Sequence, residues 1–181
     1  QNVSLDEYLE RMQDKQEKIY YITAESYAAA KNSPHLELFR KKGIEVLLMY
    51  DRVDEWMMSF MDEYNGKPFV SVAKGALDLG ELEDQEEKEK VEQAEKDCKS
   101  LLERMQNVLE GKVKEVKISH RLTDSPSCLV VSENDMAMSM QKLLKQAGHN
   151  VPNIEPDLEI NPEHALVKRL QNVDDDQQFN D

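Results

Sequence analysis

The chain has 181 residues, which suits one large domain or two small ones, and 39% of them are hydrophobic while 33% are charged. Its net charge of −14 argues against a nucleic-acid binder, because phosphate contacts need a basic face, and against a protein of anionic membrane surfaces. No apolar run approaches the roughly 20 residues that span a bilayer. The composition predicts a soluble, acidic, cytoplasmic protein with neither nucleic acid nor membrane as a partner.

The N-terminal residues show no basic segment followed by an apolar stretch, so no secretory signal is expected. Because the sequence lacks an initiator methionine, we expect a piece of a longer protein. Cys98 and Cys128 are the only cysteines, which are too few for a disulfide scaffold. Their places within a helical and a strand pattern predict small, buried apolar residues.

The first part of the chain alternates between helical and strand patterns. Apolar residues at spacings of three and four predict helices over residues 4–18, 24–31, 33–42 and 51–64. Ser4 and Thr23 are the expected caps of the first two helices, Pro34 starts the third, and Asn65-Gly66 is expected to end the fourth. β-Branched and aromatic runs predict strands over residues 18–22, 44–49 and 68–72. This order predicts a small three-layer α/β unit with parallel strand pairing.

The composition changes between residues 78 and 97, where ten acidic residues face three lysines. This segment is interpreted as the boundary between a domain of residues 1–80 and a domain of residues 81–181. Beyond it, patterns predict a helix whose apolar face runs from Val91 to Leu109, strands over 113–122 and 127–131, a helix from Ser132 to Gln146, and a last helix over 164–170. The second part is therefore expected to be α+β.

The sequence carries no recognisable reaction centre. It has neither a G-x-x-x-x-G-K-[ST] loop nor a G-x-G-x-x-G turn after a strand, and its four histidines share no metal-ligand spacing. We therefore expect no catalytic residues, no cofactor and no metal in this chain. An α/β enzyme domain is a reading with little support.

Two apolar helical patterns are more informative. On a helical wheel of residues 51–64, one apolar stripe faces the core, and it consists of Val53, Met57, Phe60, Met61 and Tyr64. Trp56 lies at the edge of this stripe, and Met58 lies outside it. In the 132–146 pattern, Met136, Met140, Leu143 and Ala147 form one stripe, and Met138 points nearly opposite. Pattern alone favours an ordinary core for both, although exposed methionine suits tolerant binding.

Long blocks of the sequence closely resemble bacterial Hsp90 chaperones. They cover residues 18–27, 33–37, 42–47, 54–58, 66–69, 121–126 and 161–164, including Asp54-Glu55-Trp56-Met57-Met58 and Arg121-Leu122-Thr123-Asp124-Ser125-Pro126. The resemblance implies the distal middle domain followed by a C-terminal, dimerisation-type domain of an ATP-driven, cytoplasmic homodimer. It also implies that ATP and magnesium bind upstream of Gln1 and that the last dimerisation helices follow Asp181. This chain would then neither bind nor hydrolyse ATP, and would form a monomer or a weak dimer.

The resemblance also implies client-binding residues and moves both apolar helices from core to partly exposed. Carried over by position, these residues are Glu55, Trp56, Ser59, Met136, Met140, Leu143 and Leu144. Ser59 departs from the family's usual Asn, and Leu144 departs from a bulkier Phe. The expected partners are unfolded or partly folded clients, and the acidic surroundings suggest a preference for basic ones. The main alternative is a structural linker or dimerisation module without client contact, in which Trp56 and Met136 are buried.

Overall fold

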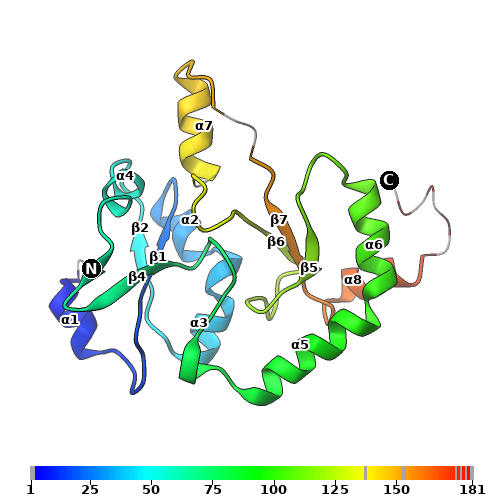
Figure 1. Cartoon of the computed structure of the whole chain (residues 1–181), viewed down its shortest axis with the longest axis horizontal. Coiled ribbons are helices and arrows are strands. Elements are labelled where there is room, and N and C mark those ends of the chain that lie inside the picture. Colours follow the sequence, from blue (N-terminus) through cyan, green and yellow to red (C-terminus); the bar gives the residue numbers. More distant parts are fainter. Residues whose placement is uncertain are drawn as a thin grey trace.

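The computed structural model describes residues 3–136, 138–151 and 154–173, together with residues 175, 177 and 179. Two separate sheets, each accompanied by helices, form a mixed α/β structure (Figure 1). The first sheet belongs to the N-terminal half, and the second belongs to the C-terminal half. This arrangement agrees with the mixed α/β class expected from the sequence.

The first sheet has the strand order β2-β1-β4-β3. Its strands are β1 Ile19–Thr23, β2 Leu47–Met49, β3 Glu63–Tyr64 and β4 Lys67–Ser71. β1 pairs in parallel with both β2 and β4, as predicted, with Tyr21 opposite Leu47 and Ile19 opposite Phe69. The antiparallel β3–β4 hairpin was not predicted, because the Asn65-Gly66 turn was interpreted as a helix end.

The helices of the first half are shorter than their patterns suggest. They are α1 Leu5–Glu10, α2 Tyr27–Lys31, the 3-10 turn η1 Pro34–Leu36, α3 Glu37–Lys42 and α4 Asp54–Met58. Ser4 caps α1 in a capping box with Glu7, as expected from the sequence. The cap of α2 is Ser26 and not Thr23, because β1 continues through Thr23. A buried cluster that includes Tyr20, Ile22, Leu36 and Phe39 packs α2, η1 and α3 against one face of the sheet.

The second sheet has the strand order β5-β7-β6. Its strands are β5 Val116–Ile118, β6 Ser127–Val130 and β7 Asp157–Ile160. The helices of this half are η2 Gly80–Leu82, α5 Gln85–Asp97, α6 Lys99–Val108, α7 Met138–Gln146 and α8 Ala165–Gln171. The central strand β7 was not predicted; it pairs in parallel with β5 and antiparallel with β6. Cys98 and Leu101 pack with Val116 and Ile118 in its core, and both cysteines are free and buried.

The acidic segment between the halves is helical and is held to the first half by ion pairs. Glu87 of α5 lies 3.1 Å from Lys41 Nζ and 2.8 Å from Lys42 Nζ, in the basic last turn of α3. Figure 1 shows α5 running along the base of the molecule toward α6. The segment is therefore a packed connection between the two sheets.

Buried Arg121 joins the two halves directly. Its guanidinium pairs with Glu159 on β7, at 2.9 Å from Nε to Oε2 and 3.0 Å from Nη2 to Oε1. The same group donates to the carbonyls of Val72 at 2.6 Å and Gly75 at 2.7 Å, which belong to the first half. Arg121 is 1% exposed, so these bonds lie in a shielded environment in which a lost partner is costly.

A second junction is made by Glu37 of α3. Its carboxylate accepts backbone N–H groups of Thr123, Asp124 and Ser125, as well as the Ser125 hydroxyl. Burial alone would raise the pKa of Glu37, but the hydrogen bonds from Ser125, Asp124 and Thr123 together hold it below its ordinary value. The two halves are thus fixed to each other at two separate charged contacts.

Candidate functional site

The helix that carries Trp56 is much shorter than predicted. α4 ends at Met58, where the Ser59 hydroxyl donates to the Trp56 carbonyl at 2.6 Å. The chain then turns back into the β3–β4 hairpin, whose Asn65 and Gly66 both have positive φ, as an Asn-Gly hairpin turn requires. A helix over residues 51–64 was therefore the wrong prediction.

The short helix changes which side chains are buried. Met58, which the wheel placed off the core stripe, is buried at 7% exposure. Val53, Met57 and Phe60, which the wheel placed in the core, are exposed. Trp56 is 65% exposed, and its ring meets Phe60 edge-on with 5.5 Å between the ring centroids. Trp56 and Phe60 therefore form an exposed aromatic pair at α4 and the turn that follows it.

Glu55 anchors α4 to the sheet beneath it. One carboxylate oxygen lies 3.2 Å from Lys74 Nζ, and the other accepts a hydrogen bond from the Thr23 hydroxyl. Both members of the ion pair are largely shielded from solvent. Burial, together with the nearby Glu55 charge, raises the pKa of Tyr21 on β1. Because its oxygens are bound inside the protein, Glu55 differs from Trp56, which faces outward.

The loop after β4 supports both sides of the site. The Lys74 side chain holds α4, while its backbone forms an isolated parallel bridge with Val131. The next residue, Gly75, donates its N–H to the Val131 carbonyl at 2.9 Å. A Cβ on Gly75, whose φ is +61°, would lie 3.3 Å from the Glu133 Cβ, so the chain leading to α7 passes closely over this loop.

The opposite side of the site is formed by the segment after Val131 and by α7. The helix begins at Met138, later than the predicted start after Ser132. Buried Gln141 donates to the Met136 carbonyl at 2.8 Å, which fixes the approach to the helix. Lys142 of α7 pairs with Glu25 of the first half at 3.1 Å, where both side chains are exposed.

A groove of about 1040 Å³ lies between these two sides. It is lined by six of the seven residues that the Hsp90 resemblance singles out: Glu55, Trp56, Ser59, Met136, Met140 and Leu144. Leu143 lies on α7, but its side chain is outside the described residues. Met136 is 36% exposed, and Met140 and Leu144 are half-buried. Residues from two distant parts of the sequence therefore face one space.

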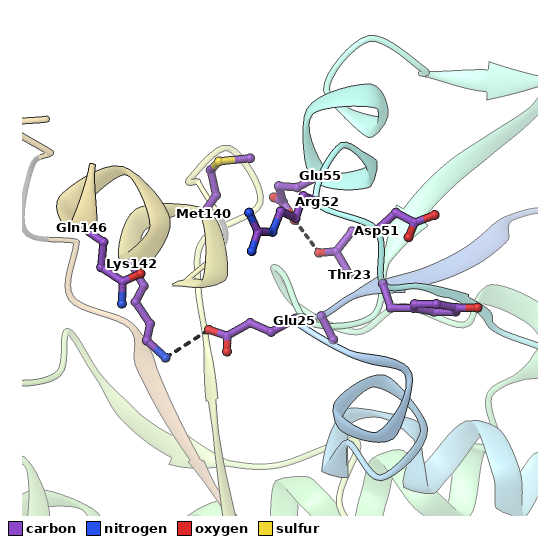
Figure 2. Close-up of a pocket in the computed structure, with 10 residues that line it drawn as sticks. Thr23, Glu25, Asp51, Arg52, Glu55, Met140, Lys142 and Gln146 are labelled. Atoms are coloured by element: carbon purple, nitrogen blue, oxygen red, sulfur yellow. Dashed lines mark hydrogen bonds and ion pairs between the residues drawn. The ribbon is translucent and has the colours of Figure 1, made fainter. Parts of the chain in front are cut away.

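A smaller cavity of about 280 Å³ adjoins the groove, with Glu55 and Met140 in both linings. Figure 2 shows it between the ends of the first-sheet strands and α7, with the Lys142–Glu25 and Thr23–Glu55 contacts across and beside it. Arg52 and Asp51 enter it from the chain before α4. This end of the site is polar, whereas the Trp56 end is rich in apolar side chains.

The sequence matches the family model described as Hsp90 protein over residues 1–181. The chain belongs to the Hsp90 family. It is 59% identical to the chaperone protein HtpG of Alkalilimnicola ehrlichii over 180 residues, and these make up 99% of this chain and 28% of that protein. It is 57% identical to HtpG of Cupriavidus taiwanensis over all 181 residues, which make up 29% of that protein. It is 61% identical to HtpG of Burkholderia cenocepacia over 170 residues, which make up 94% of this chain and 27% of that protein. The chain thus spans less than a third of these curated relatives.

Several groove residues of this Hsp90 chain were missed by sequence reasoning. Tyr21 and Phe69 line the groove because the outer face of the first sheet forms its floor, and Lys74 reaches it from the loop after β4. Alternation along β1 was the available signal, since Tyr20 and Ile22 face the core and Tyr21 must then face the other way.

Over the described residues, no helix is long and apolar enough to cross a membrane, and no three His, Cys, Asp or Glu side chains are grouped to hold a metal ion.

Proposed function

We propose that this Hsp90 chain binds apolar segments of unfolded or partly folded client proteins in the groove between α4 and α7. The observation that carries the proposal is the exposed Trp56, which lines one groove together with Met136 and Met140 from the other half of the chain. Exposed large apolar side chains gathered at a concave surface favour binding of another protein. Ser59 and Leu144 complete the proposed contact surface with Leu143, while Glu55 supports it from below.

The proposed affinity is low and the specificity broad. Each large apolar side chain that becomes fully buried contributes about 1.5–3 kcal/mol, and ordering the client segment offsets part of this. The flexible thioethers of Met136 and Met140 fit many shapes, which suits a surface that accepts different sequences. A few such contacts give reversible binding, as a chaperone needs in order to release its client.

In the whole protein, we propose that this chain is the client-contacting part of an ATP-driven, cytoplasmic homodimer. ATP and magnesium would bind to parts of the protein other than these residues, and the second half would belong to a dimerisation-type C-terminal domain. The proposal rests on membership of the Hsp90 family and on the HtpG relatives. The linker alternative expects buried Trp56 and Met136, and their exposed fractions of 65% and 36% count against it.

The proposal is tested by measuring binding of a permanently unfolded protein to the 181-residue chain and to single variants. Trp56→Ala and Met136→Ala are each expected to weaken binding by about tenfold, with little change in the free energy of unfolding, because both side chains are exposed. Leu166→Ala is the matched control, since Leu166 is exposed on α8 outside the groove. Equal affinity of all four proteins would contradict the proposal.

A further inference from the structure

The charged residues that line the groove are unequally distributed between the two signs. They are Lys18, Glu55, Asp62, Lys74, Asp78, Glu133 and Asp135. Two lysines against five carboxylates give the lining a formal charge of −3. Because clefts focus the field of their own charges, this excess acts on whatever enters the groove.

Both lysines are already neutralised by neighbouring carboxylates. Lys18 Nζ lies 2.8 Å from Asp78, and Lys74 Nζ lies 3.2 Å from Glu55. Across the part of the chain that the structure describes, no ion pair is formed by the three remaining acids, Asp62, Glu133 and Asp135. The negative charge available to a bound partner therefore comes from these three residues.

The three acids stand on both sides of the apolar surface. Asp62 follows α4 on the Trp56 side, whereas Glu133 and Asp135 precede Met136 on the α7 side. The chain just before Glu133 is held by the hydrogen bond from the Gly75 N–H to the Val131 carbonyl at 2.9 Å, and Asp135 donates its N–H to the Ser132 carbonyl at 3.0 Å. Their carboxylates are thus attached to positioned backbone at the edges of the groove.

The aromatic surface between the acids favours the same kind of partner. Trp56 is 65% exposed, and its ring meets Phe60 edge-on, which leaves much of the indole accessible to a partner. An exposed indole face attracts a guanidinium or ammonium group by cation–π interaction. Carboxylates and indole therefore both favour a basic side chain beside the apolar contacts.

We propose that the groove selects client segments in which apolar residues are flanked by lysine or arginine, and disfavours segments flanked by aspartate or glutamate. This selectivity rests on the proposed client binding and adds the chemical class of the bound segment. Each exposed charge pair changes an affinity by a factor of about 1.5 to 5, so three acids give about tenfold discrimination at low salt. Screening over a Debye length of about 10 Å at 0.1 M salt reduces it further as salt rises.

The test uses three labelled peptides that share one apolar centre and carry lysines, glutamates or serines at both ends. Their affinities for the whole 181-residue chain are measured by fluorescence anisotropy at low and moderate salt. The lysine-flanked peptide is expected to bind about tenfold more tightly than the glutamate-flanked one at low salt, with a smaller ratio at moderate salt. Equal affinities of these two peptides at low salt would overturn the inference.

A triple variant locates the effect in the groove. Asp62→Asn, Glu133→Gln and Asp135→Asn together are expected to reduce the lysine-to-glutamate ratio to about twofold and to leave the serine-flanked peptide unchanged. The matched control neutralises three exposed acids of α5, Glu86→Gln, Glu92→Gln and Glu95→Gln, which changes the net charge equally but lies outside the groove. If the control lowers the ratio as much as the groove variant, net charge alone explains the effect and the inference fails.

The serine-flanked peptide separates this inference from the proposed function. Suppose that Trp56→Ala weakens binding of the serine-flanked peptide, while the lysine- and glutamate-flanked peptides bind the parent chain equally. Client binding in the groove would then be supported, and only the charge selectivity would be removed. Unaltered binding of every peptide to the Trp56→Ala variant would instead remove the proposed function, and the selectivity with it.

Discussion

Glu55 and Lys74 form an ion pair beneath the helix that presents Trp56, with 3.2 Å between Oε1 and Nζ and both side chains largely shielded from solvent. The second carboxylate oxygen of Glu55 accepts from the Thr23 hydroxyl on β1. The resemblance to other Hsp90 chains marks Glu55 as a client contact, yet its oxygens are engaged by the protein itself. We therefore expect Glu55 to hold α4 in place, so that its effect on binding passes through Trp56.

Lys74→Met tests this positioning role. The change leaves Glu55 half-buried without its cation, so we expect a loss of about 1–3 kcal/mol in the free energy of unfolding. Amide hydrogen exchange of α4 should also become faster, because the helix loses its attachment to the loop after β4. Lys142→Met, which breaks the exposed pair with Glu25, is the control and should cost less than about 0.5 kcal/mol. Unchanged exchange of α4 in Lys74→Met would refute the anchoring role.

Arg121→Met is expected to weaken the junction between the two halves and so to destabilise the fold. It leaves Glu159 buried without a cation and removes the donor from the Val72 and Gly75 carbonyls, which should cost about 3–5 kcal/mol in urea unfolding. The control is Arg11→Met, because Arg11 makes a similar two-point contact with Glu45 at a solvent-exposed site and should cost less than about 1 kcal/mol. Similar costs for the two variants would show that the buried junction is not special.

His35 predicts a pH dependence of stability. Burial, followed by the nearby Arg121 charge, lowers the pKa of His35 to about 4 from an ordinary value of 6.5. Between these two values the unfolded chain binds a proton that the folded chain does not, so stability falls as the pH drops through this window, by up to about 3 kcal/mol. His35→Gln should flatten that part of the profile, whereas His149→Gln at an exposed position should leave it unchanged. A His35→Gln profile as steep as that of the parent chain would contradict the assignment.

Both cysteines should be unreactive in the folded protein. Burial raises the pKa of Cys98, and burial followed by the Glu159 charge raises the pKa of Cys128 to about 12. Because the thiolate is the reactive form, a polar thiol reagent at pH 8 should label neither residue until the chain is unfolded, when it should label both. Rapid labelling of the native protein would show that one of these thiols is accessible.

The parallel pairing of the first sheet could be predicted because β1 is a continuous apolar and aromatic run between helical patterns. The central strand β7 could not, because it carries a charged residue, Glu159, on a buried side. That carboxylate is tolerated because Arg121, distant in the sequence, neutralises it, while the Ser119 hydroxyl donates to it at 2.8 Å. Such a compensation between distant residues has no local signal.

The burial of the Trp56 region was predicted wrongly for a different reason. A helical wheel assumes that the helix continues, whereas α4 ends at Met58 and the chain enters the β3–β4 hairpin. Asn65-Gly66, a strong hairpin signal, was present in the sequence and was interpreted as a helix stop. The expectation of an exposed Trp56 came from the family resemblance, and it agrees with the structure.

The most direct test of client binding is the fluorescence of Trp56, the only tryptophan of the chain, with a soluble quencher and then with a permanently unfolded protein. With 65% of the residue exposed, we predict a red-shifted emission that the quencher reduces readily. Addition of the unfolded protein should shift the emission to the blue and protect it from the quencher, because the indole becomes buried against the bound segment. An accessible signal that stays unchanged at saturating unfolded protein would contradict the proposed groove.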